Sequence, residues 1–182
     1  MSQMPIVSVT RTPPGLPKVL GAEVRVRSDE RPTREELLAF VKGSAVVITM
    51  YSDKVDNEFL DAAGPQLLGV CNFAVGYENI DLEACRRRGV KATNTPNAVT
   101  EGTADMAWTL ILGAARRIIE ADRYARSPEY PRRGNLGMAE FLGLDLTGRT
   151  LHIVGAGRIG FAVAMRSRGW GMRVCYTARG HD

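Results

Sequence analysis

The sequence contains few of the residues that bind metals or form disulfide bonds. Its 182 residues include three cysteines and two histidines, His152 and His181. The cysteines show no C-x-x-C spacing, and with so few histidines we expect no metal site. An odd number of cysteines favours reduced thiols, so we expect a cytoplasmic protein.

Long apolar runs and a secretory signal are also missing. No apolar stretch approaches the roughly 20 residues that a membrane-spanning helix needs. The first residues, MSQMP, lack the basic-then-apolar layout of a signal peptide. The net charge is +4, but the basic residues are mostly scattered and do not alternate with aromatic residues. The sequence therefore predicts neither a membrane protein nor a nucleic-acid-binding protein.

The first hundred residues alternate short apolar runs with helical patterns. Strands are expected at residues 5–10, 22–27, 45–50, 67–72 and 90–93, with residues 22–27 near an edge. Helices are expected after the capping residues Thr33, Asp56 and Asp81, the first with a capping box that Glu36 completes. This alternation predicts the α/β class, with an open, mostly parallel, flavodoxin-like sheet over residues 1–99.

The next segment, residues 100–127, has the pattern of one long helix. Its first half is apolar on almost every side, and such a helix must be buried on several sides. We therefore expect it to lie between domains or subunits, which favours a homodimer. Residues 128–147 contain several prolines and glycines and are expected to form an irregular loop.

Residues 148–182 hold the most informative pattern. Residues 151–154 predict a buried strand, residues 158–168 a helix, and residues 172–177 a second strand. Gly155, Gly157 and Gly160 lie between the first strand and the helix, with the spacing G-x-G-x-x-G. This context predicts the first βαβ element of a Rossmann domain that binds a dinucleotide. A glycine-rich turn that binds no ligand is the alternative.

Each glycine has a separate expected role. Gly155 turns the chain tightly, Gly157 allows a diphosphate to approach the backbone, and Gly160 allows the helix to pack against the sheet. The N–H groups of Arg158, Ile159 and Gly160 then face the ligand at the positive end of the helix dipole.

The end of the second strand bears on the choice of coenzyme. NAD-binding proteins place an acidic residue there, which binds the ribose 2′-hydroxyl. Here Thr177, Ala178 and Arg179 follow, with no acid before Asp182. Thr177 and Arg179 can bind a 2′-phosphate, so the sequence predicts NADP, with NAD still possible. The alternative is that Arg179 is simply an exposed loop residue.

Several motifs together resemble a known family. They are residues 72–81 (NFAVGYENID), 93–97 (TNTPN), 100–108 (TEGTADMAW), 143–148 (GLDLTG) and 153–160 (IVGAGRIG). In these motifs the chain resembles the D-isomer-specific 2-hydroxyacid dehydrogenases, in particular the NADP-using glyoxylate/hydroxypyruvate reductases. The resemblance implies hydride transfer from NAD(P)H to a small 2-oxo acid, which yields the D-2-hydroxy acid.

The resemblance also implies roles for individual residues. The amides of the loop that contains Val75 and Gly76 are expected to hold the substrate carboxylate, and Tyr51 is expected to line the same pocket. Thr103 is expected to face the coenzyme. The alternatives are an ordinary strand-to-helix connection at residues 74–77 and simple helix capping by Thr103.

No catalytic residue is expected among these 182 residues. The Arg, Glu and His that the resemblance implies lie beyond Asp182, His152 is expected to be a packed core residue, and His181 is near the chain end. We therefore expect no dehydrogenase activity from this chain alone, and a marginally stable last third. Two alternatives remain: a non-catalytic relative that binds a nucleotide or a protein, and a related dehydrogenase acting on phosphoglycerate or formate.

Overall fold

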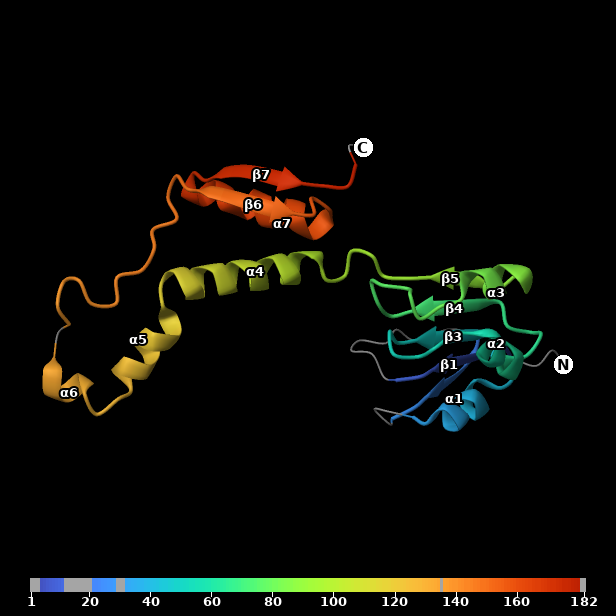
Figure 1. Cartoon of the computed structure of the whole chain (residues 1–182). Helices are drawn as coiled ribbons and strands as arrows, with labels where there is room; N and C mark the ends of the chain where they lie inside the picture. The colour runs from blue at the N-terminus through green and yellow to red at the C-terminus, as the bar shows by residue number, and fades with distance from the viewer. Residues whose placement is uncertain (1–3, 12–20, 29–31, 135, 181–182) are drawn as a thin grey trace. The chain divides into compact units, whose positions relative to one another are not determined.

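The computed structural model describes residues 4–11, 21–28, 32–134 and 136–180 (Figure 1). The chain folds into two compact units, Met1–Ala98 and Val99–Asp182. His181, which the sequence places near the chain end, lies outside the described residues.

The first unit is built on a five-stranded parallel sheet, which confirms the predicted fold class. In sheet order the strands are β2 (Glu23–Val26), β1 (Ile6–Val9), β3 (Val46–Thr49), β4 (Gly69–Asn72) and β5 (Lys91–Thr93). All neighbouring strands are parallel, and β2 lies at an edge. The order 2-1-3-4-5 is the flavodoxin-like order, in which ligands bind at the carboxyl ends of the strands.

Three helices pack against this sheet through one hydrophobic core. They are α1 (Arg34–Val41), α2 (Asn57–Ala63) and α3 (Leu82–Arg87). Thr33 and Glu36 form the predicted capping box of α1. Asp56 and Asp81 each accept a hydrogen bond from a first-turn amide, at 3.1 and 2.8 Å. The buried residues that join helices and sheet include Leu37, Val41, Val47, Phe59, Leu60, Val70, Ala84 and Cys85.

The second unit contains the predicted strand–helix–strand element. Its elements are α4 (Thr100–Ala115), α5 (Ile118–Ala125), α6 (Tyr130–Arg133), β6 (Thr150–Val154), α7 (Arg158–Arg166), the 3₁₀ helix η1 (Ser167–Trp170) and β7 (Arg173–Thr177). β6 and β7 are paired in parallel from end to end, and α7 connects them. The side chain of Arg166 fixes α7 to α4, with hydrogen bonds to Glu101 and Asp105 that are both 2.7 Å long.

The predicted single helix over residues 100–127 is wrong, because the segment forms two helices. α4 ends at Ala115, and Arg117 then adopts a left-handed conformation with φ 52° before α5 begins. At this break the carbonyl of Ala115 accepts a hydrogen bond from the amide of Leu144 at 2.7 Å instead of from the next turn of a helix. The predicted loop over residues 128–147 also contains a helical turn, α6.

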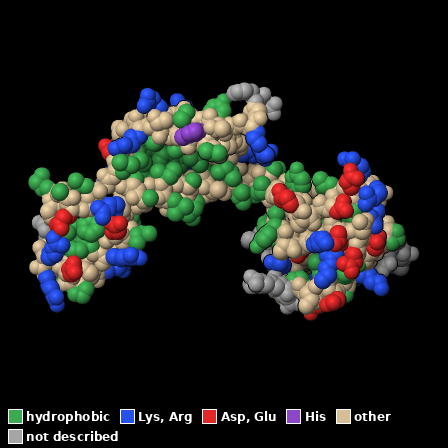
Figure 2. Space-filling view, viewed as in Figure 1, with side chains coloured by type: hydrophobic (Ala, Val, Ile, Leu, Met, Phe, Trp, Pro, Cys, Tyr) green, Lys and Arg blue, Asp and Glu red, His purple; other side chains and the backbone are tan. Residues whose placement is uncertain are grey.

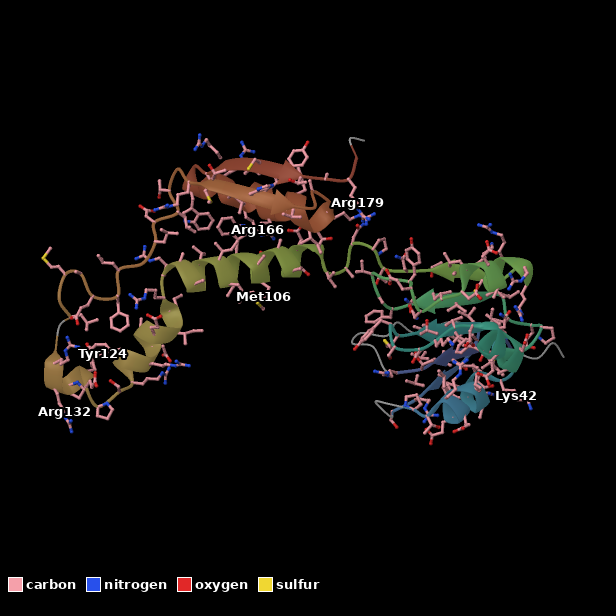
Figure 3. All side chains as sticks on the ribbon, viewed as in Figure 1. Lys42, Met106, Tyr124, Arg132, Arg166 and Arg179 are labelled. Carbon is pink, nitrogen blue, oxygen red and sulfur yellow. The ribbon has the colours of Figure 1, made fainter. Side chains whose placement is uncertain are left out.

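The apolar surface of α4 is covered on one side only. Ala104 and Trp108 are buried, whereas Met106 and Leu110 are 57% and 65% exposed. Figure 3 shows Met106 projecting from the side of α4 that faces away from α7, and Figure 2 shows hydrophobic side chains gathered on this unit's surface. Within this unit α7 covers one side of α4, and the expected position of the helix between domains or subunits stays a prediction.

The strands of the second unit are also more exposed than predicted. Val154 is 85% exposed and none of the residues of β6 is buried, so the predicted burial of this strand is not found within the unit. Every residue of β7 is exposed as well. His152 is not a core residue either, because its exposed ring forms a 2.9 Å hydrogen bond with the hydroxyl of Thr177. Among the described residues this sheet has two strands and one packed helix, which leaves its other face uncovered.

Candidate functional site

The glycine turn between β6 and α7 has the geometry that its spacing predicts. Gly155 has a φ of 95°, which strongly favours glycine. A Cβ on Gly160 would lie 2.3 Å from the carbonyl oxygen of Gly155, so only glycine allows α7 to lie this close to β6. A Cβ on Gly157 would meet nothing within 4 Å, so this position is open for a ligand to approach the backbone.

The first turn of α7 carries amides that the protein does not use. Gly157 is the N-cap of α7 and provides no side-chain cap. Within the described chain, the amides of Arg158, Ile159 and Gly160 have no acceptor; the first amide with a partner is that of Phe161, which bonds to the Gly157 carbonyl at 2.8 Å. Unpaired amides at a helix N-terminus bind anions. The turn therefore fits the diphosphate of a dinucleotide.

The end of β7 lies beside an open groove. Thr177, Ala178 and Arg179 are exposed, and Figure 3 shows Arg179 just beyond the end of β7. A cavity of about 300 Å³ extends between α7 and β7, and residues that line it include Gly160, Phe161, Tyr176 and Ala178. The structure thus brings the predicted contacts Gly160 and Ala178 to one groove, whereas contact with a coenzyme stays a prediction.

Thr103 lies in the first turn of α4 with an exposed side chain. The N-cap of α4 is Val99, which makes no side-chain capping bond. The alternative role of Thr103 as the helix cap is therefore wrong, and its contact with the coenzyme stays a prediction.

The loop after β4 turns its carbonyl groups towards the protein. Three successive carbonyl oxygens accept hydrogen bonds: Ala74 from the Thr95 amide (2.9 Å), Val75 from Asn94 Nδ2 (2.8 Å), and Gly76 from Asn72 Nδ2 (2.8 Å). Because C=O and N–H point in opposite directions across a trans peptide bond, the next three amides point away from these partners. They belong to Val75, Gly76 and Tyr77, and none has an acceptor in the described chain.

Such a row of amides can bind one anion. The arrangement therefore fits a carboxylate at Val75 and Gly76 better than it fits an ordinary connection. Gly76 does not need a positive φ here, and the only close contact of an added Cβ would be with the flexible Glu78 side chain. The open amides thus arise from the bound carbonyls rather than from an unusual glycine conformation.

A neighbouring loop follows β3 and carries Tyr51, which is 74% exposed. Next to it, Ser52 accepts a 2.6 Å hydrogen bond from Arg11, a residue just after β1. Sequence reasoning missed Arg11, Asn72 and Asn94 as residues that shape these loops. All three lie at carboxyl ends of parallel strands, and this shared position was the available signal.

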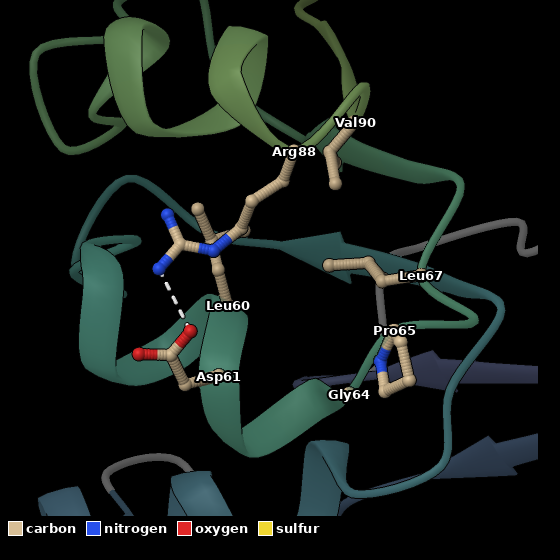
Figure 4. Close-up of a pocket in the computed structure, with 7 residues that line it drawn as sticks. All are labelled: Leu60, Asp61, Gly64, Pro65, Leu67, Arg88 and Val90. Carbon is tan, nitrogen blue, oxygen red and sulfur yellow. Dashed lines mark hydrogen bonds and ion pairs between the residues drawn. The ribbon is translucent and has the colours of Figure 1, made fainter.

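A cavity of the first unit lies at the opposite edge of the sheet from these loops. Figure 4 shows this cavity of about 380 Å³, with Leu67 and Val90 from the segments that precede β4 and β5. Asp61 and Arg88 form a 2.7 Å ion pair across it. None of the predicted site residues lines it.

The described residues contain no group of three or more His, Cys, Asp or Glu side chains that could hold a metal ion. None of their helices has the length and apolar character to cross a bilayer.

A family model described as "D-isomer specific 2-hydroxyacid dehydrogenase, catalytic domain" matches residues 6–179. A glyoxylate reductase from Thermococcus kodakarensis is 52% identical over 159 residues, which make up 86% of this chain and 47% of the relative. The chain spans about half the length of the curated relatives it matches.

Solved structures show the same relationship. A Thermus thermophilus protein has a TM-score of 0.86 and 42% identity, and the match covers 97% of this chain and 57% of that one. An NADPH-dependent glyoxylate/hydroxypyruvate reductase from Sinorhizobium meliloti, in complex with NADP and malonate, has a TM-score of 0.72 and 28% identity, and the match covers 99% and 55%. The chain thus belongs to the D-isomer specific 2-hydroxyacid dehydrogenases, a family of NAD(P)-dependent enzymes that act on small 2-oxo acids.

Proposed function

We propose that this chain supplies the coenzyme diphosphate site and the substrate carboxylate site of a reductase for glyoxylate, hydroxypyruvate or a similar 2-oxo acid. The observation that carries the proposal is the open first turn of α7, where Gly157 leaves space beside unpaired amides. Residues 1–99 would serve as the substrate domain, and residues 148–182 as the start of the coenzyme domain. A cytoplasmic location is part of the same proposal.

The substrate assignment is supported by the loop at residues 74–77. Its open amides fit a carboxylate, the group that all 2-oxo acids share. Relatives named glyoxylate reductase favour a small substrate, and the Sinorhizobium meliloti relative was solved with malonate, a carboxylate. Tyr51 would line the pocket beside this loop.

The coenzyme is proposed to be NADP, with NAD as the alternative. When bound, the nicotinamide donates a hydride to the keto carbon of the substrate. Gly155, Gly157 and Gly160 would shape the diphosphate site, with the amides of Arg158 and Ile159 as donors. At the end of β7, Thr177, Ala178 and Arg179 would surround the 2′-phosphate, and Thr103 would face the coenzyme.

We propose that the 182-residue chain binds these ligands without turning them over. Reduction also needs a group that delivers a proton to the substrate oxygen. The exposed ring of His152 is hydrogen-bonded to Thr177 at the proposed 2′-phosphate site, a position that suits coenzyme binding rather than proton delivery to a 2-oxo acid. No catalytic residue is therefore assigned within this chain.

A homodimer is proposed from the apolar surface of α4 and α5. Leu110, Ile118 and Ile119 are 65%, 54% and 67% exposed, and such a surface is typical of an interface. The same surface supports a second candidate function, a non-catalytic module that binds another protein. Analytical ultracentrifugation separates the two: self-association that Leu110→Glu abolishes favours the homodimer, and a monomer favours the second function.

The proposed coenzyme site is tested by titrating the 182-residue chain with NADPH while nicotinamide fluorescence and heat are recorded. We expect saturable binding at or below about 1 mM, which corresponds to about −4 kcal/mol. Absence of binding by a chain that circular dichroism shows to be folded would overturn the proposal. Turnover of glyoxylate by the same preparation would contradict the proposed lack of catalysis.

A further inference from the structure

We propose that Asn79 is a positioning residue that couples the two loops of the substrate pocket. The inference depends on the proposed carboxylate site at residues 74–77. The loop after β4 carries Val75 and Gly76, and the loop after β3 carries Tyr51. The Asn79 side chain is hydrogen-bonded to the loop after β3 and to Asn72, the last residue of β4, which in turn bonds to Gly76 in the loop after β4.

The contacts form a continuous path between the two loops. Asn79 Nδ2 donates to the carbonyl oxygens of Met50 (3.2 Å) and Asp53 (2.9 Å). Asn79 Oδ1 accepts from Asn72 Nδ2 (3.0 Å), which also donates to the carbonyl of Gly76 (2.8 Å). The orientation of the Gly76 peptide is therefore linked to that of the Met50 peptide through two side-chain amides.

The main chain of Asn79 is itself fixed. Its carbonyl accepts a 2.8 Å hydrogen bond from the amide of Val55, a fully buried residue. The Val55 carbonyl in turn accepts from the amide of Asp81 at 2.8 Å. Because Val55 holds the backbone from Asn79 to Asp81, the Asn79 side chain presents a donor and an acceptor at set positions.

The loop after β3 has a second internal support. The Asp53 side chain is almost completely buried, and its carboxylate accepts from the Met50 amide at 2.8 Å and from the Thr10 hydroxyl. These contacts and those of Asn79 thus join the loop into one hydrogen-bonded network, and a buried polar network is stable only when all its members have partners. An anion that binds the amides of residues 75–77 is expected to reorient the segment that carries Tyr51.

The test uses the ¹⁵N-labelled 182-residue chain with glyoxylate as the probe. Asn79→Ala removes the coupling side chain. Ser44→Ala is the matched control, because it removes a buried 2.7 Å hydrogen bond to Ser8 at the amino edge of the same sheet. Should Asn79→Ala fail to fold, Asn79→Asp removes the donors and keeps the side-chain size.

In the wild type we expect glyoxylate to shift the amide signals of residues 75–77 and also those of residues 50–53. In the Asn79 variant, affinity should fall by about tenfold or more, and the shifts at residues 50–53 should disappear. In Ser44→Ala the affinity should stay within about twofold of the wild type, and glyoxylate should still shift the signals of residues 50–53. A folded Asn79 variant with unchanged affinity and unchanged shifts at residues 50–53 would overturn the proposal.

Amide hydrogen exchange without ligand tests the coupling independently of the proposed function. Faster exchange in both loops of the Asn79 variant, but not in Ser44→Ala, supports the coupling, and equal exchange in the two variants overturns it. If the wild type shows no glyoxylate-induced shift at residues 75–77, the carboxylate site fails, and the exchange data alone decide whether Asn79 joins the loops.

Discussion

The indole rings of Trp108 and Trp170 are stacked, with centroids 4.5 Å apart and planes inclined by 12°. Trp108 Nε1 also donates a 2.9 Å hydrogen bond to the carbonyl of Val163 in α7. Trp108 is 4% exposed, whereas much of the apolar surface on α4 is open. This contact joins α4 to α7 and to the 3₁₀ helix η1 that follows it, and we expect it to stabilise the second unit.

We expect Trp108→Ala to destabilise the second unit by about 3–5 kcal/mol, because both the buried ring and its hydrogen bond are lost. Thr109→Ala is the control on the same helix, at an exposed residue, and should change stability by no more than about 0.5 kcal/mol. Urea unfolding followed by circular dichroism measures both. Equal midpoints for the two variants would show that the stacked rings contribute little.

The glycine turn offers two variants that should separate an effect on stability from an effect on coenzyme binding. Gly160→Ala should destabilise the second unit, because its Cβ would lie 2.3 Å from a carbonyl oxygen. Gly157→Ala should cost about 1 kcal/mol or less in stability. It should nevertheless weaken NADPH binding by about tenfold or more, since the methyl group would occupy the proposed diphosphate position. NADPH binding by Gly157→Ala at wild-type affinity would argue against this position.

The choice between NADP and NAD is tested at Arg179. Arg179→Glu should weaken NADPH binding far more than NADH binding, because the carboxylate would repel the 2′-phosphate that NADH lacks. Arg179→Gln is the neutral comparison and should have a smaller effect of the same kind. Fluorescence titrations with both coenzymes measure these changes. An equal loss for NADPH and NADH would reject a role for Arg179 in discrimination.

The stability of the first unit should depend on pH through Asp56. Burial raises the pKa of this carboxyl, but hydrogen bonds from the Phe59 amide, Lys54 and Arg34 outweigh burial, so the pKa lies below its ordinary value. A carboxyl with a lowered pKa in the folded state contributes stability above its unfolded pKa, near about 3.9. That contribution is lost as the pH falls through the folded pKa.

Asp56→Asn keeps a capping side chain and removes the charge. The difference in urea midpoint between wild type and Asp56→Asn should therefore be constant near neutral pH and should shrink below about pH 4. Glu58→Gln is the control, because Glu58 contacts the same Arg34 at 3.0 Å with a side chain that is 64% exposed. A difference that persists unchanged down to pH 2 would show that the charge of Asp56 does not stabilise the helix.

Local signals predicted the elements of the first unit because their causes are local. Thr33, Asp56 and Asp81 each bond to an amide three residues away, and the glycine spacing sets the turn before α7. The break after α4 was not predictable in this way, because it coincides with a hydrogen bond between Ala115 and Leu144, which are distant in the sequence. The exposure of His152 likewise depends on what covers the sheet rather than on the strand itself.

The loop proposed to bind the substrate carboxylate was predicted only through family resemblance. Its motif places Val75 and Gly76 after a strand, but the orientation of their peptides depends on Asn72 and Asn94 from the ends of two separate strands. Such contacts between distant segments leave no periodic pattern in one sequence. The coupling role of Asn79 was missed for the same reason.

The proposed recognition through peptide groups would make the loop between Asn72 and Gly76 sensitive to its length rather than to its composition. Replacing the side chain of Val75 leaves every donor and acceptor of that stretch in place. Inserting one residue would instead separate the side-chain amide of Asn72 from the Gly76 carbonyl to which it donates. It would also turn the backbone N–H groups of residues 75–77 away from a common direction. Substitutions should therefore be tolerated here where insertions and deletions are not.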